Sequence, residues 1–180
     1  MTYAVQGAVA PTPAGLFAAG HLRRLLLVFA AMGMAFVLIA ITTPPPAQAG
    51  ATEAEKIVRI AKSYIGARFR MGATGYRYFD CSGFVYRVYK EAGLLRRIGG
   101  REMTAAGYYH WFKRRGLLSG RRHTGDLIWW KKRGVIKHIG IYIGNGYAVS
   151  ALVNPWGVMK HTVGGIHMRF AAYGHVRLER

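Results

Sequence analysis

Cys81 is the only cysteine in this chain of 180 residues, and it directly follows Asp80 where a helix is expected to begin. The nucleophilic form of cysteine is the thiolate, which the positive end of a helix dipole stabilises. A cysteine in the first turn of a helix therefore predicts an enzyme with a thiolate nucleophile. The alternative is a buried cysteine that packs as a small apolar side chain and does no chemistry.

A cysteine nucleophile needs a base within hydrogen-bond reach, and the base needs a partner that orients it. His138 is the best candidate among the seven histidines, because it starts a β-rich run that leads into a turn at residues 144–146. His110 falls within an expected helix and His123 within a basic loop, where an ordinary surface imidazole is the simpler interpretation. Cys81 and His138 together predict covalent acyl transfer.

A glycine-rich turn predicts which residues face His138. We expect Gly-Asn-Gly at residues 144–146 to form a three-residue hairpin loop, in which glycine supplies the left-handed conformation. In that register His138 lies opposite Leu152, and Gly140 lies opposite Ser150. A two-residue loop would reverse the parity and turn the side chains of the second strand to the other face.

Two polar residues are candidates to orient His138. Side chains two residues apart on a strand share a face, so Ser150 and Asn154 each lie diagonally across from the imidazole. Such diagonal neighbours are roughly 7–8 Å apart at the backbone, which favours the longer side chain of Asn154. However, Pro155 follows it and can turn the strand away there. Ser150 and Asn154 therefore both remain candidates.

Three helices are predicted in the first half of the domain. The first begins at a capping box formed by Thr52 and Glu55 and ends near Gly66. The second begins at Asp80, a good helix cap, and the third covers residues 104–115. The second helix buries a stripe of side chains at helical spacing: Phe84, Val85, Val88, Tyr89 and Ala92.

From residue 126 onward the pattern changes to short β-rich runs separated by turn residues. Predicted strands cover residues 127–130, 136–143, 147–153, 157–163 and 175–178. Helices followed by strands predict an α+β domain, in which the helices pack on an antiparallel sheet. We expect one such domain over residues 50–180.

The first 49 residues have the three parts of a signal peptide: basic residues at 23–24, an apolar run over residues 25–41, and Ala47-Gln48-Ala49. We therefore predict cleavage before Gly50. The 17-residue apolar run borders on the length that spans a membrane, so an uncleaved anchor is the alternative. A lone cysteine in an exported protein cannot form an internal disulfide, which favours a reactive thiol.

The exported part of the chain is strongly basic. Residues 1–49 hold two of the 26 Lys and Arg and none of the seven Asp and Glu, so residues 50–180 carry a formal charge of +17. Such a charge predicts anionic envelope polymers or carboxylate-rich substrates as partners. Nucleic acid is the other common polyanion, but export makes it a poor partner, and none is expected. The sequence shows no metal-ligand spacing and no nucleotide loop, so we expect no metal and no cofactor.

Three segments, in order and spacing, resemble the NlpC/P60 family of bacterial cell-wall cysteine peptidases. They are Asp-Cys-Ser-Gly-Phe-Val at 80–85, Gly-Asp-Leu at 125–127 and His-Ile-Gly-Ile-Tyr-Ile-Gly-Asn-Gly at 138–146. The resemblance covers nearly all of residues 52–180. It implies a papain-like fold, with the nucleophile at the N-terminus of a helix packed on an antiparallel sheet that bears the histidine. It also implies cleavage of peptidoglycan stem peptides, often between γ-D-glutamate and a diamino acid.

By this resemblance Cys81 is the nucleophile, His138 the base and Ser150 the third polar residue. Serine departs from the family's usual His, Asn or Gln at that position. Phe69 stands where the family often has a tyrosine, twelve residues before the cysteine. Asp126 is interpreted as a structural residue that holds the turn before its strand.

The combined prediction is a cell-wall cysteine endopeptidase, secreted or periplasmic and associated with the cell envelope. It would contact the membrane only if the leader is retained. The departures at Ser150 and Phe69 leave open a catalytically impaired module that binds peptidoglycan or anionic polymer. An acyl or amide transferase that uses the same Cys81 and His138 pair is a further hypothesis.

Overall fold

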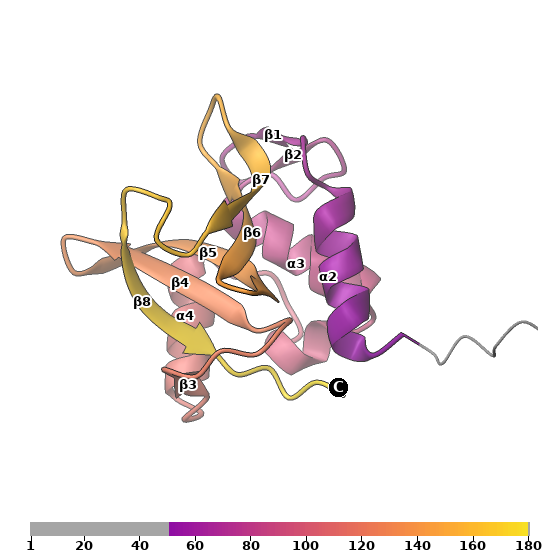
Figure 1. Cartoon of the computed structure of the whole chain (residues 1–180), viewed down its shortest axis with the longest axis vertical. Helices are drawn as coiled ribbons and strands as arrows, with labels where there is room; N and C mark the ends of the chain where they lie inside the picture. The colour runs from indigo at the N-terminus through magenta and orange to yellow at the C-terminus, as the bar shows by residue number, and fades with distance from the viewer. Residues whose placement is uncertain (1–50, 180) are drawn as a thin grey trace, which may run out of the picture. The chain divides into compact units, whose positions relative to one another are not determined.

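The computed structural model of the protein describes residues 51–179 (Figure 1). The predicted signal peptide of residues 1–49 lies outside the described residues. Within residues 51–179, no helix is long and apolar enough to cross a membrane.

All three predicted helices are present. The Thr52 hydroxyl accepts a hydrogen bond from the backbone of Glu55, and the Glu55 carboxylate accepts one from the backbone of Thr52, which is the predicted capping box. Asp80 and Thr104 cap the next two α-helices. These starts were predictable because a cap acts within one turn of the chain. The helical elements are α2 (Glu53–Ser63), α3 (Cys81–Glu91), the 3₁₀ helix η1 (Leu95–Ile98) and α4 (Ala105–Lys113).

One six-stranded sheet forms the second half of the domain. Its strands lie in the order β3-β8-β4-β5-β6-β7, and every adjacent pair is antiparallel. In Figure 1, α3 and α4 lie behind this sheet. The strands are β3 (Leu118–Ser119), β4 (Leu127–Lys132), β5 (Val135–Gly144), β6 (Tyr147–Leu152), β7 (Gly157–Thr162) and β8 (Arg169–Gly174). A separate parallel pair, β1 (Arg68–Phe69) and β2 (Tyr78–Phe79), is too short for the sequence pattern to predict.

The predicted strand at residues 175–178 is wrong. The last strand is β8, and residues 175–179 continue without strand structure. Here the backbone N–H of Val176 donates to the buried carboxylate of Asp126, 3.0 Å away, instead of to a neighbouring strand. The Asp126 carboxylate thus takes the place of a neighbouring strand as the acceptor. The residue pattern at 175–178 gives no sign of this side-chain contact.

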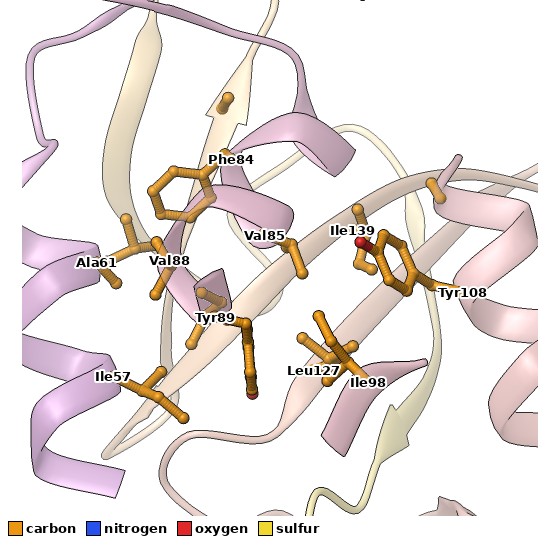
Figure 2. Close-up of a cluster of buried hydrophobic side chains, with 14 of the residues drawn as sticks. Ile57, Ala61, Phe84, Val85, Val88, Tyr89, Ile98, Tyr108, Leu127 and Ile139 are labelled. Carbon is orange, nitrogen blue, oxygen red and sulfur yellow. The ribbon is translucent and has the colours of Figure 1, made fainter. Parts of the chain in front are cut away.

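Side chains of the sheet alternate between two apolar layers. Leu127 and Trp129 of β4 belong to the larger layer beneath the helices, whereas Ile128 and Trp130 belong to a smaller cluster on the opposite face. Because both faces are buried, β4 is a continuous apolar run in the sequence. Figure 2 shows the larger layer, where side chains of the helices meet those of β4 and β5: Ile57, Ala61, Val85, Tyr108, Leu127 and Ile139.

Candidate active site

The start of α3 is held by the carboxylate of Asp80. One oxygen, Oδ1, accepts from the backbone N–H of Gly83 at 2.7 Å and from the Ser82 hydroxyl at 2.9 Å. The other, Oδ2, accepts from the backbone N–H of Gly72 at 2.8 Å. Because both oxygens are engaged, the cap also ties the preceding loop to the helix. Cys81, the first residue of α3, is thereby fixed in position.

Close packing makes glycine necessary at position 83. A Cβ atom added there would lie 2.2 Å from the backbone oxygen of Ala73, well inside van der Waals contact. The first turn of α3 therefore lies directly against the loop that precedes it. This contact and the Asp80 cap hold the N-terminus of the helix from two sides.

The Cys81 thiol lies beside the backbone of β5. The backbone N–H of Ile139, the residue that follows His138, interacts with the sulfur and lowers the pKa of the thiol. The ladder pairing of β5 with β6 extends only as far as Ile141 opposite Val149, two residues short of Ile139. No hydrogen bond joins the Cys81 thiol directly to the His138 ring in the part of the chain that the structure describes.

The thiol is protonated at neutral pH. Burial raises the pKa of Cys81 to about 11, and the Asp80 carboxylate also raises it, while backbone N–H groups of Ile139 and Ser82 lower it. The backbone N–H groups at the helix start do favour the thiolate, as expected, but burial has the larger effect on the pKa of Cys81. Desolvation of a charged sulfur outweighs the local dipoles.

Alkylation of Cys81 is expected to accelerate as the pH rises. With a thiol pKa of about 11, the rate constant for iodoacetamide should rise roughly tenfold per pH unit between about pH 7 and 10, without a plateau. The same protein unfolded in urea has an ordinary thiol, so its rate should level off near pH ~9. A plateau below pH 8 in the folded protein would contradict the upward shift.

His138 is buried on the sheet face opposite the helices. It is 4% exposed, and its Nε2 lies 2.8 Å from the Ser150 hydroxyl. The ring of Trp130, directly opposite on β4, lies 5.3 Å from the imidazole. Burial, and to a lesser degree repulsion from His161, lowers the pKa of His138 to about 3. Because Cys81 is also neutral, the substrate-free site does not hold a thiolate–imidazolium pair.

The predicted register of the hairpin is confirmed. Ile141 pairs with Val149 and Tyr142 with Ala148, so the same register brings Gly140 to Ser150. A Cβ atom on Gly140 would lie 2.8 Å from the Ser150 Cβ, and glycine therefore lets the two strands approach closely.

Ser150, and not Asn154, contacts the imidazole. Ser150 is fully buried in β6, whereas Asn154 is exposed in the turn between β6 and β7. Within residues 51–179, the structure shows no hydrogen bond from the Asn154 side chain. The pairing of β6 with β7 ends at Leu152, so Asn154 lies outside the sheet and its longer side chain is not held beside the imidazole.

Sequence reasoning missed a third buried polar residue of this cluster, His161 of β7. Its Nε2 lies 2.8 Å from the Ser150 hydroxyl, and its Nδ1 lies 2.9 Å from the backbone oxygen of Thr162. In the pairing of β7 with β6, His161 lies opposite Ala148, which makes it a diagonal neighbour of Ser150. The only signal was its place in a predicted strand, and the preceding turn did not set the register of that strand.

An apolar cavity of about 320 Å³ has His161 in its wall. Trp156, which is 63% exposed, contributes an indole to the rim. Cys81 does not line this cavity, so it adjoins the imidazole cluster rather than the thiol. The other apolar side chains of its wall come from β6, β7, the turn between them and the segment before β8: Leu152, Val153, Met159, Ile166 and Met168.

Asp126 ties the turn before β4 to the C-terminal segment. Its Oδ2 accepts from the backbone and the ring of His123, at 3.0 and 3.2 Å, and its Oδ1 lies 3.7 Å from Nδ1 of His175. Together with the Val176 contact, these bonds agree with a structural role. Among the described residues, His123, Asp126 and His175 form the group that could hold a cation, with ligand atoms within 4.8 Å of one another. The arginines at 121, 122 and 177 lie close to His123 or His175 in the sequence. Their positive charges disfavour the binding of a cation by this group.

A helix with a cysteine at its N-terminus, packed on an antiparallel sheet that carries a buried histidine, defines a papain-like α+β domain. The chain belongs to the NlpC/P60 family, whose model matches residues 66–172. The resemblance and the fold predicted from the sequence are thus confirmed. Phe69, the departure noted above, lies on β1 and packs against the larger core layer.

The relatives differ in length from this chain. The probable endopeptidase p60 of Listeria monocytogenes is 29% identical over 99 residues, which cover 54% of this chain and 19% of p60. The murein DD-endopeptidase MepS/murein LD-carboxypeptidase of Escherichia coli strain K12 is 33% identical over 86 residues, covering 48% of this chain and 43% of that protein. The chain therefore matches less than half the length of these curated relatives.

A solved structure agrees with the fold. The NlpC/p60 domain of the peptidoglycan hydrolase SagA superimposes with a TM-score of 0.51 at 27% identity. The superposition covers 66% of this chain and 97% of that domain. The similarity therefore includes almost the whole of the SagA domain.

Proposed function

We propose that the protein is a peptidoglycan hydrolase that cleaves stem-peptide bonds with Cys81 as nucleophile and His138 as base. The observation that carries the proposal is the contact of the Cys81 sulfur with the backbone beside His138. It unites a thiol at a capped helix start with a buried imidazole that has its own polar partner. Membership of a family that includes named endopeptidases supports the same reaction.

The reaction begins with transfer of the Cys81 proton to His138. The sulfur then attacks the peptide carbonyl carbon, and the backbone N–H of Cys81, at the N-terminus of α3, donates to the oxyanion. His138 gives its proton to the leaving amine as the carbon–nitrogen bond breaks, which leaves a thioester. Water that His138 deprotonates attacks the thioester, and the acid product and the free thiol result. Because both groups start neutral, charge appears only during the reaction.

The substrate bond that we propose is the one between γ-D-glutamate and the diamino acid. A formal charge of +17 over residues 50–180 favours stem peptides, which are rich in carboxylates, and anionic envelope polymers. The E. coli relative is named as a DD-endopeptidase, so its bond is the main competitor. We place the protein in the cell envelope, secreted or periplasmic, after removal of residues 1–49.

Digestion of purified peptidoglycan tests the proposal. The products, analysed by mass spectrometry, should contain a new free amino group on the diamino acid, together with shortened peptides that end in γ-D-glutamate. A free amino group on a D-alanine cross-link partner would instead assign the competing bond. Intact fragments with the wild-type protein would sink the hydrolase proposal. Binding to insoluble wall without cleavage would then favour the impaired binding module.

A further inference from the structure

We infer that His161 is a positioning residue, which acts through the Ser150 hydroxyl to hold His138 in the tautomer that leaves Nδ1 free to take a proton. The inference rests on the proposed function, because it gives the base of that reaction a second supporting imidazole. It also accounts for serine at a position where the hydroxyl alone is a weak director of an imidazole.

The backbone oxygen of Thr162 determines which ring nitrogen of His161 carries the proton. Nδ1 of His161 lies 2.9 Å from this oxygen. A carbonyl oxygen can only accept a hydrogen bond, so Nδ1 of His161 must carry the proton and donate it. The ring of His161 is 7% exposed, and burial lowers its pKa, so the ring is neutral at pH 7. Its Nε2 is therefore an acceptor.

The Ser150 hydroxyl carries this orientation to His138. With Nε2 of His161 as an acceptor at 2.8 Å, the hydroxyl must donate its one proton to His161. The oxygen of Ser150 then accepts from Nε2 of His138, also at 2.8 Å. His138 is neutral and carries its proton on Nε2, so Nδ1 keeps its lone pair. Nδ1 is the nitrogen that we expect to take the proton of the thiol.

Without His161, the direction of the hydrogen bond between the Ser150 hydroxyl and His138 would not be fixed. A serine hydroxyl rotates freely and can donate to an imidazole nitrogen or accept from it, so alone it permits both tautomers of His138. Burial removes water as an alternative partner, because Ser150 is fully buried and the two histidines are nearly so. The Trp130 ring lies 5.3 Å from His138 and 5.5 Å from His161, and its Nε1 donates to the backbone of Val163 at 2.8 Å. A fixed indole thus confines both rings.

Nitrogen NMR on protein with ¹⁵N-labelled histidine tests the tautomer directly. In the wild type, the His138 signals, assigned by their loss in His138→Gln, should show a protonated Nε2 and an unprotonated Nδ1 at pH 7. His161→Phe keeps a ring of similar size but removes the acceptor, and a mixture of His138 tautomers is expected. His110→Phe changes an exposed histidine of α4 and should leave the His138 signals unchanged. A protonated Nδ1 in the wild type, or unchanged signals in His161→Phe, would overturn the inference.

Kinetics separate positioning from packing. His161→Phe should lower kcat for peptidoglycan fragments roughly 10- to 100-fold with little change in KM, as for other residues that orient a base. His161→Gln can present an amide oxygen to the Ser150 hydroxyl, so it should keep most of the activity. Equal losses in the Phe and Gln variants, with one His138 tautomer throughout, would leave His161 a packing residue. If the wild type cleaves nothing, the proposed function fails while the NMR result still decides the tautomer.

Discussion

Cys81→Ser is expected to release no peptides from peptidoglycan, a loss on the order of 10³-fold or more, as when other enzymes lose their nucleophile. The serine hydroxyl is far less acidic than a thiol. The first proton transfer to His138 is therefore far less favourable from serine than from cysteine. The measurement is the initial rate of fragment release, followed by chromatography and mass spectrometry.

The control for Cys81→Ser is the fold and the binding of the variant. Serine is close in size to cysteine, and the Asp80 cap does not involve the sulfur, so thermal unfolding should be nearly unchanged. Sedimentation with insoluble wall should also be unchanged, because the basic surface is intact. Equal cleavage by Cys81→Ser and wild type would show that another group performs the chemistry.

Trp129→Ala is expected to lower the free energy of unfolding by about 3–5 kcal/mol, as for other fully buried large side chains. The indole is fully buried between β4 and α4, where the ring of Phe112 lies 5.3 Å away. Its Nε1 donates to the backbone oxygen of Ala105 at 2.9 Å, so alanine would leave a cavity and remove this hydrogen bond. Equilibrium unfolding in urea measures the change.

Trp156→Ala is the matched control for this prediction. The same substitution at an indole that is 63% exposed removes few contacts, and the change should stay within about 1 kcal/mol. A loss at Trp129 no larger than that at Trp156 would mean that the layer between β4 and α4 contributes little to stability.

The parts of the site that sequence reasoning predicted are those set by local signals. The Asp80 cap acts over three residues, so the place of Cys81 at a helix start followed from the sequence. The glycine-rich turn between β5 and β6 set their register, which made Ser150 a neighbour of His138 predictable. Both features depend on hydrogen bonds or turn conformations within a short stretch of chain.

The choice between Ser150 and Asn154 needed the tertiary structure. Reach favoured Asn154, but the chain leaves the sheet before that residue, and the exposed side chain does not contact the imidazole. His161 was missed for a related reason. Its place beside Ser150 depends on the register of β7 against β6, and the turn between them has no glycine pair that would specify this register.

The sequence by itself determined the helix start that presents Cys81 and the hairpin that presents Ser150, because caps and tight turns are encoded by neighbouring residues. The papain-like fold and the family followed from the resemblance of three sequence segments to the NlpC/P60 family. Only the tertiary structure decided the protonation of Cys81 and His138, and only the tertiary structure placed His161 beside Ser150. Both depend on burial and on contacts between distant segments: desolvation raises the pKa of the thiol to about 11 and lowers that of the imidazole to about 3. Since desolvation depends on everything packed around a group, no local pattern of residues contains it.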